Sequence, residues 1–194
     1  MNPLNTIQGT LIAGVVIAVV IALATMGISF NVQSFIMWIH VGAGVTWIGL
    51  LYYFNFVQVP ALAAAAKDQG GPGGAGISKY VAPRALLWFR WGAVVTWLSG
   101  VAYLAHLNLL VPALTLQGGA LVIGVGAWLG TIMLFNVWVL IWPNQKKVLG
   151  LVEATADQIA KARRVAFLAS RTNTMLSIPM LMSMVGFGHG GFFL

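Results

Sequence analysis

The chain has 194 residues, of which 60% are hydrophobic and 7% charged, with a net charge of +7 and no cysteine. Soluble domains carry about 25% charged residues, so this composition excludes an ordinary soluble domain and indicates an integral membrane protein. The lack of cysteine excludes disulfides, thiolate metal sites and a covalently attached c-type haem. In a chain this apolar, the positive charge is better explained by cytoplasmic loops than by a nucleic-acid partner.

Five apolar stretches are long enough to cross a bilayer, because a helical span needs about 20 residues. They predict an all-α bundle in one membrane domain over residues 1–194. The predicted spans are 9–30, 34–57, 85–107, 118–142 and 166–188. The first stretch is preceded by no Lys or Arg, unlike a secretory signal peptide, so it is predicted to be a retained helix.

Two loops hold most of the charge, and they set the predicted orientation. All ten Lys and Arg residues and all three Asp and Glu residues lie in the second and fourth loops or within a turn or two of them. Two loops separated by two crossings share a face, and the positive-inside rule makes that face cytoplasmic. The sequence therefore predicts a multi-pass protein of the bacterial inner membrane, with its N-terminus inside and its C-terminus outside. Within these loops, residues 69–76 predict a flexible Gly-rich connection and residues 151–164 a short cytoplasmic helix.

Three histidines are the candidate cofactor ligands, and the predicted topology places all of them at or near the outer face. His40 lies about six residues into the second span, whereas His106 and His189 close the third and fifth spans. An ionisable side chain within a span is costly and is often functional. Two histidines on neighbouring helices can ligate a b-type haem, and imidazole also suits copper. The alternative is that His106 and His189 lie in interfacial water and that His40 bonds a backbone carbonyl.

Other polar residues in the spans are few. The spans contain no Asp or Glu, which argues against a proton pump or an ion-coupled transporter. Asn55 and Asn136 are predicted to hydrogen-bond between helices. Gly126 and Gly130 form a GxxxG pattern that permits close helix approach, although glycine is too common here for the pattern to be specific.

Four stretches resemble a known family. They are WIHVGAGVTWIGLLYYFNFVQ (38–58), WFRWGAVVTWLSGVAYL (88–104), GTIMLFNVWVLIWPNQKKV (130–148) and SRTNTMLSIPMLMSMVGFGH (170–189). Together they resemble the membrane domain of bacterial membrane-bound urate hydroxylases, the urate oxidase N-terminal family. A looser similarity of residues 38–53 to other small haem-binding membrane proteins agrees with this. The resemblance implies oxidoreductase chemistry and, in the full architecture, a C-terminal cytochrome c domain, which this sequence does not contain.

The chain keeps some positions of the family pattern and departs from others. The kept positions are His40, Trp47, Gly49, Trp97, Asn136, Pro143, Asn144 and Gln145. The resemblance implies a Glu where this chain has Gly92, a His where it has Thr172, and a further His in the fourth span that it lacks. The departures remove residues able to move protons or bind metal, which argues against urate oxidation by this chain.

Three hypotheses follow from the sequence. The first is a membrane subunit of a larger oxidoreductase or respiratory assembly that is not catalytic alone, with a b-type haem at His40 and with other membrane subunits as partners. The second is a urate-hydroxylase-like membrane oxidase that passes electrons to a separate cytochrome. The third is a structural helical subunit without a cofactor. Catalytic residues are not identified under any of them.

Overall fold

A computed structural model describes residues 2–27 and 29–190, and these residues form helices and loops without a β-strand. The C-terminus itself, predicted to lie outside, falls beyond the described residues. The chain divides into two compact units, residues 1–32 and 33–194. The first unit contains the 3-10 turn η1 (Pro3–Asn5) and the apolar helix α1 (Ile7–Met26). Thr6 caps α1, because its hydroxyl accepts a hydrogen bond of 3.0 Å from the backbone N–H of Gly9.

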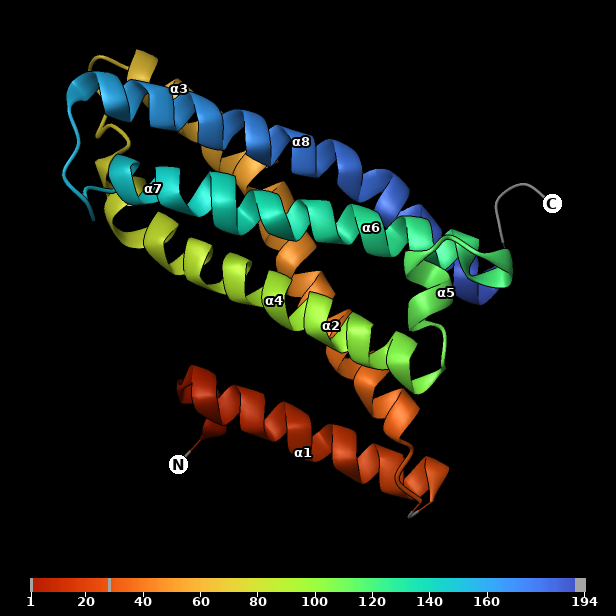
Figure 1. Ribbon diagram of the computed structural model, residues 1–194. Coiled ribbons are helices and arrows are strands. Elements are labelled where there is room, and N and C mark those ends of the chain that lie inside the picture. Colours follow the sequence, from red (N-terminus) through yellow and green to blue (C-terminus); the bar gives the residue numbers. More distant parts are fainter. Residues whose placement is uncertain (1, 28, 191–194) are drawn as a thin grey trace. The chain divides into compact units, whose positions relative to one another are not determined.

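The second unit is a bundle of long helices, whose segments lie side by side in Figure 1. In chain order its elements are α2 (Val32–Tyr52), η2 (Tyr53–Gln58), α3 (Val59–Lys67), η3 (Ile77–Val81), α4 (Ala82–His106), α5 (Leu110–Leu114), η4 (Gly118–Ala120), α6 (Leu121–Phe135), η5 (Asn136–Ile141), α7 (Trp142–Val148) and α8 (Ala156–His189). The helix α8 lies along α6 and α7, and the short helix α5 packs on α6.

Three of these segments are π-helical turns, and each precedes a proline. They are η2, η3 and η5, followed by Pro60, Pro83 and Pro143. The residue before each proline donates its backbone N–H to the carbonyl five residues earlier: Val59 to Phe54, Ala82 to Ile77, and Trp142 to Val137. Proline has no N–H and crowds the preceding turn, and the wider π turn accommodates it without ending the helix. The helices therefore continue past the span ends that the sequence predicts at 57 and 142.

The core of the second unit lies where α2, α4, α6 and α8 meet. Trp47, Leu51 and Phe89 are at most 2% exposed, and the ring of Phe54 meets that of Phe89 edge-on at 5.4 Å between centroids. Met133 of α6 is fully buried in the same cluster. A smaller cluster at the other end of the bundle joins Leu104, Ala113 and Ile123.

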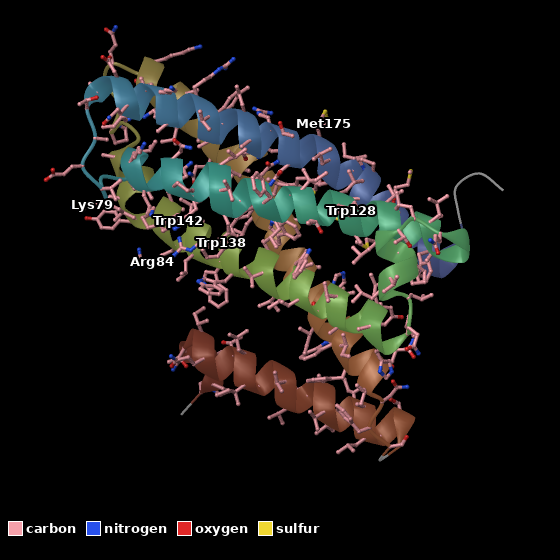
Figure 2. The ribbon with its side chains drawn as sticks, in the orientation of Figure 1. Lys79, Arg84, Trp128, Trp138, Trp142 and Met175 are labelled. Atoms are coloured by element: carbon pink, nitrogen blue, oxygen red, sulfur yellow. The ribbon has the colours of Figure 1, made fainter. Side chains whose placement is uncertain are left out.

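The interface between α6 and α8 is built from small and polar residues. The buried residues of α8 recur every three or four positions: Ala162, Ala166, Ala169, Asn173, Ser177, Met180 and Ser183. Between Thr172 and Val185 its large exposed residues are apolar, and they include Met175, labelled in Figure 2, and Ile178. This is the reverse of a helix in a water-soluble bundle, in which the apolar face is buried.

Four helices are long and apolar enough to cross a membrane, and they correspond to the first four predicted spans. They are Ile7–Thr25, Val32–Lys67, Ile77–His106 and Gly118–Val148. The helix α8 is not among them, because its first half carries charges such as Arg163 and Arg164 and its buried stripe is polar. The helix predicted over 151–164, leading into the fifth predicted span, begins at Ala156, because Thr155 and Gln158 form a capping box that starts α8. The helix then continues without a break to His189.

Candidate functional site

His40 is half-buried on α2, where it faces α4. Its Nδ1 lies 2.8 Å from the backbone carbonyl oxygen of Thr96 and 3.3 Å from the hydroxyl of Ser99. A carbonyl oxygen can only accept, so Nδ1 carries the proton and donates it to Thr96. In the neutral ring, Nε2 then holds a lone pair, and it has no hydrogen-bond partner within the described residues. The ring is thus fixed in one tautomer with one nitrogen available as a ligand.

The sequence makes room for this ring with Gly100 of α4. A Cβ at Gly100 would lie 2.9 Å from Cε1 of His40 and 3.3 Å from its Nδ1. Any larger residue at position 100 would displace the imidazole from the Thr96 carbonyl. One turn along α4, the hydroxyl of Tyr103 accepts a hydrogen bond of 3.2 Å from Gln33 of α2, which also holds the two helices together.

The other two histidines are solvent- or lipid-exposed at helix ends. His106 is the last residue of α4 and lies about 10 Å along the helix from Ser99, at 1.5 Å per residue. His189 ends α8, with its Nδ1 3.4 Å from the carbonyl of Val185 one turn earlier. Neither forms a hydrogen bond with His40. The described residues also contain no cluster of three or more His, Asp or Glu side chains.

Both asparagines that the sequence predicts to link helices do so. Nδ2 of Asn136 in η5 donates to Oδ1 of Asn173 in α8 at 2.8 Å, and Nδ2 of Asn173 donates to the carbonyl of Met133 at 3.0 Å. Nδ2 of Asn55 in η2 donates to the hydroxyl of Ser170 in α8 at 2.8 Å. A similar bond from Nε1 of Trp97 to Thr131 joins α4 to α6 at 2.9 Å.

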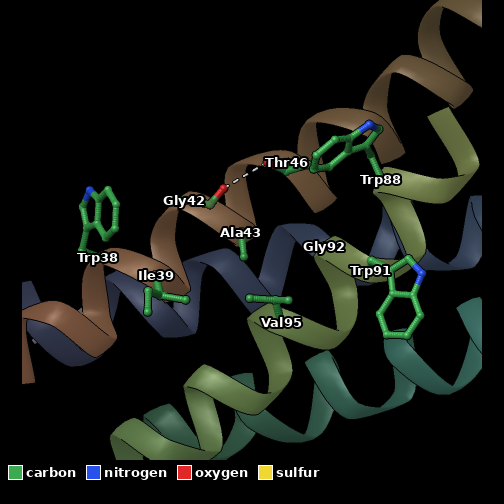
Figure 3. Close-up of a pocket in the computed structure, with 9 residues that line it drawn as sticks. All are labelled: Trp38, Ile39, Gly42, Ala43, Thr46, Trp88, Trp91, Gly92 and Val95. Carbon is green, nitrogen blue, oxygen red and sulfur yellow. Dashed lines mark hydrogen bonds between the residues drawn. The ribbon is translucent and has the colours of Figure 1, made fainter. Parts of the chain in front are cut away.

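A shallow groove of about 420 Å³ runs along the surface between α2 and α4 (Figure 3). Its floor is made of small residues, including Gly42, Ala43 and Gly92, and the indoles of Trp38, Trp88 and Trp91 surround it. The three indoles are more than half exposed. They lie on a face that the sequence assigns to a membrane, where exposed Trp rings favour the interface.

The structure shows the surroundings of two positions, 92 and 172, at which the chain departs from the urate-hydroxylase pattern. Gly92 is buried at the floor of the α2–α4 groove, where a Cβ would make ordinary contacts, the nearest at 3.4 Å from the backbone nitrogen of Trp47. Thr172, at the position of the implied histidine, is exposed on α8. Neither position offers an acid, a base or a metal ligand in this chain.

A larger basin of about 810 Å³ opens at the charged end of the bundle, among η2, α3, α4, α7 and α8. Its inner wall is apolar and includes Phe54, Leu86 and Phe89. Asn55, Gln58, Gln145 and Ser170 add polar groups, and Arg163 and Arg164 add positive charge, with no Asp or Glu among its lining residues. Sequence reasoning identified Asn55 as a buried polar residue but missed the basin, because its walls come from segments far apart in the chain.

Aromatic and cationic side chains also gather at this end. The guanidinium carbon of Arg90 lies 3.7 Å from the centre of the Trp142 ring, and Trp138 packs edge-on against Trp91 at 5.5 Å between centroids. Lys79, Arg84, Trp138 and Trp142 are labelled in this region in Figure 2. Trp and cationic residues at such a level are typical of the boundary between hydrocarbon and water.

The comparison with protein families gives a match over almost the whole second unit. The family model described as urate oxidase N-terminal matches residues 28–118 and 113–193. No match was found among curated proteins or solved structures.

Proposed function

The chain belongs to the urate oxidase N-terminal family, and from this premise we propose that it is a membrane subunit of an oxidoreductase assembly that binds a b-type haem through His40. The observation that carries the proposal is the fixed tautomer of His40, with Nδ1 bonded to the Thr96 carbonyl and Nε2 free. Histidine ligands of metals commonly donate their other ring N–H to a carbonyl or carboxylate in this way.

The donor set fits haem better than a protein-only metal site. A copper site needs several protein ligands, whereas the described residues contain no cluster of three or more candidate side chains. A porphyrin supplies four nitrogens itself, so one or two imidazoles from the protein are sufficient. When bound, haem would supply one-electron transfer. In this chain, Thr96, Ser99 and Gly100 orient the imidazole of His40, and a second imidazole would come from His106, His189 or another subunit.

The chain lacks residues with which it could catalyse a reaction without a partner, and this supports the proposed assembly. Gly92 and Thr172 stand where the family resemblance implies a glutamate and a histidine, and neither can move a proton or bind a metal. The three exposed indoles around the α2–α4 groove offer an apolar surface to lipid or to a helix of another subunit. We therefore favour a subunit that is not catalytic alone over a complete urate-oxidising enzyme.

His40 gives the direct test of the haem. In the purified native complex, the reduced wild-type protein is expected to show a b-type absorption spectrum. The His40→Ala variant is expected to lose or shift that spectrum, because its only replacement for the imidazole is water or vacant space. His40→Gln is expected to behave like His40→Ala, because an amide replaces the hydrogen bond to Thr96 but not the iron ligand. Absorption spectra of the membrane-inserted protein measure the effect of both His40→Ala and His40→Gln.

His189→Ala tests one candidate second ligand, the exposed histidine at the end of α8. It should leave the His40-dependent part of the spectrum in place, and a shift would identify His189 as the second ligand. A wild-type complex without any haem spectrum, or a His40→Ala variant with an unchanged one, would contradict the proposal. The structural-subunit hypothesis would then take its place.

We extend the proposal to the topology: α8 is the fifth span, which places the N-terminus inside and the C-terminus outside. The support is that between Thr172 and Val185 its large exposed residues are apolar, while Asn173 and Ser177 are buried in the bundle and hydrogen-bonded. A membrane span with satisfied polar groups inside and apolar groups outside is stable in lipid. All charges near α8 lie before Thr172, at the end that also holds the other charged loop.

A reporter fused after Leu194 tests this topology. An alkaline phosphatase fusion is expected to be active, because that enzyme needs the periplasm, and a green fluorescent protein fusion at the same position is expected to be dark. Matching fusions after Gly150, in the loop before α8, should give the opposite pair of results. Fluorescent fusions after both Gly150 and Leu194 would place the two positions on the same side and remove α8 from the set of spans, whereas a fluorescent fusion after Leu194 with a dark one after Gly150 would invert the orientation.

A further inference from the structure

We propose that the exposed surface where α4 meets α7 binds an anionic phospholipid, with the lipid phosphate between Arg90 and Lys146 and an acyl chain along the apolar residues beside them. The proposal does not depend on the haem. It rests on three features of this surface: two cations at one indole ring, no acidic residue in the helices that carry them, and an exposed apolar strip that continues from the cations.

Trp142 is the centre of the surface, because both cations lie at its ring. The guanidinium carbon of Arg90 in α4 is 3.7 Å from the centre of the ring, and Nζ of Lys146, one turn along α7, is 6.0 Å from it. The first distance is that of a close cation–π contact, which holds the guanidinium in place at the charged end of the bundle (Figure 2). Two like charges at one ring repel each other, so the pair favours an anion shared between them.

The helices around Trp142 supply no anion for this pair. The three acidic residues of the chain are Asp68, Glu153 and Asp157, and none belongs to α4, η5 or α7. Arg90 lies eight residues into α4, or about 12 Å along the helix, within a helix that is long and apolar enough to cross a membrane. A guanidinium stays charged in proteins and is costly inside a span, so at this level it requires a negative partner.

An exposed apolar strip leads away from the cations and indicates that the anion belongs to a lipid. Val139 and Phe135 precede Trp142 by three and seven residues and are 49% and 55% exposed. Trp91 of α4 is 51% exposed and packs edge-on against Trp138, with 5.5 Å between centroids, so both helices contribute to the apolar surface. A free phosphate ion would contact only the cations, whereas a phospholipid would contact the cations with its headgroup and the strip with an acyl chain.

This surface is separate from the two sites described above. Arg90, Trp142 and Lys146 do not line the basin, to which α7 contributes Gln145 and Val148 instead. Arg90 also precedes Thr96, the partner of His40, by six residues, or about 9 Å along α4. A lipid bound at Trp142 would therefore leave both the basin and His40 accessible.

Three probes separate the charge of the headgroup from the acyl chains. Dioleoyl phosphatidylglycerol has both, dioleoyl phosphatidylcholine has the same chains and no net charge, and inorganic phosphate has the charge without chains. Native mass spectrometry of the full chain in detergent measures binding of each added lipid. We expect the first phosphatidylglycerol to bind about 5- to 10-fold more tightly than the first phosphatidylcholine, because each cation near a lipid phosphate adds to the affinity. An equal concentration of inorganic phosphate should not displace it.

Variants assign the preference for phosphatidylglycerol to particular side chains. Arg90→Gln and Lys146→Gln are each expected to reduce it about 3- to 5-fold, because each removes one charge from the phosphate. Trp142→Leu should reduce it as well, since the ring that positions both cations is gone, and it serves as the second variant if Arg90→Gln fails to insert. Arg171→Gln is the matched control. Arg171 also lies over an aromatic ring, 5.2 Å from the centre of Phe167, but in the described residues no second cation shares that ring.

Three results would overturn the proposal. Equal affinity of the wild-type protein for the two lipids would show that the surface does not distinguish an anionic headgroup. An equal loss of preference in Arg171→Gln and Arg90→Gln would show attraction by net charge alone. Displacement of phosphatidylglycerol by an equal concentration of inorganic phosphate would identify a site for a soluble anion and not for a lipid.

Discussion

Replacing Gly124 by alanine is expected to destabilise the second unit by about 2–4 kcal/mol, because the new methyl group meets backbone. A Cβ at Gly124 would overlap the carbonyl oxygen of Ala113 in α5 and would also lie 2.9 Å from a methyl carbon of Leu116. A carbonyl cannot rotate away as a flexible side chain can, so α5 must separate from α6. The free energy of unfolding is measured by titrating dodecyl sulfate into mixed micelles and following the helical signal.

Gly130→Ala is the matched control, since it makes the same chemical change in the same helix. Gly130 is buried as well, but a Cβ there would meet nothing within 4 Å. Because alanine favours helix by up to about 1 kcal/mol over glycine, this variant should be as stable as the wild type or more stable. Equal destabilisation by both changes would show that α5 does not pack on Gly124 as the structure has it.

Replacing Asn173 by leucine is expected to cost about 2–4 kcal/mol, measured in the same titration. Asn173 is fully buried and joins two partners, accepting from Asn136 and donating to the Met133 carbonyl. Leucine fills a similar space but leaves the buried amide of Asn136 without its acceptor and removes the second donor to the Met133 carbonyl, which still accepts from the backbone N–H of Asn136. Single hydrogen bonds between membrane helices contribute about 0.6 kcal/mol on average. Most of the expected loss of stability therefore comes from burying the unpaired side-chain amide of Asn136.

The control for Asn173→Leu is Thr172→Leu, one residue earlier on the exposed side of α8. It introduces the same side chain without breaking a contact between helices, and its effect is expected to stay within about 0.5 kcal/mol. If Thr172→Leu is as damaging as Asn173→Leu, the face of α8 that packs on α6 has been assigned wrongly.

Sequence alone is sufficient to assign the class of the protein and its first four apolar helices. Long apolar stretches can satisfy their backbone in lipid only as helices, so hydropathy predicts these four spans without knowledge of their packing. The same local character makes Asn55 and Asn136 recognisable as links between helices, since a polar amide within an apolar stretch needs a partner. The four stretches led by WIHVGAGVTW indicate the family by their residues and spacing, and the family match over residues 28–118 and 113–193 confirms it.

Contacts between segments far apart in the sequence determine how α8 packs and how both candidate sites are built, and these contacts form only in the folded chain. Composition cannot show that Asn173 and Ser177 of α8 face the inside of the bundle, because polar residues lower the hydropathy of a helix whether they face lipid or protein. Nor does the sequence show which nitrogen of His40 is free. That depends on the Thr96 carbonyl, 56 residues away in the chain. The basin at the charged end is the clearest case. Its polar residues Asn55 and Gln58 come from η2, whereas Arg163 and Arg164 come from the start of α8. Local sequence governs hydrogen bonds within a helix, whereas a site between helices exists only once their packing has set which faces meet.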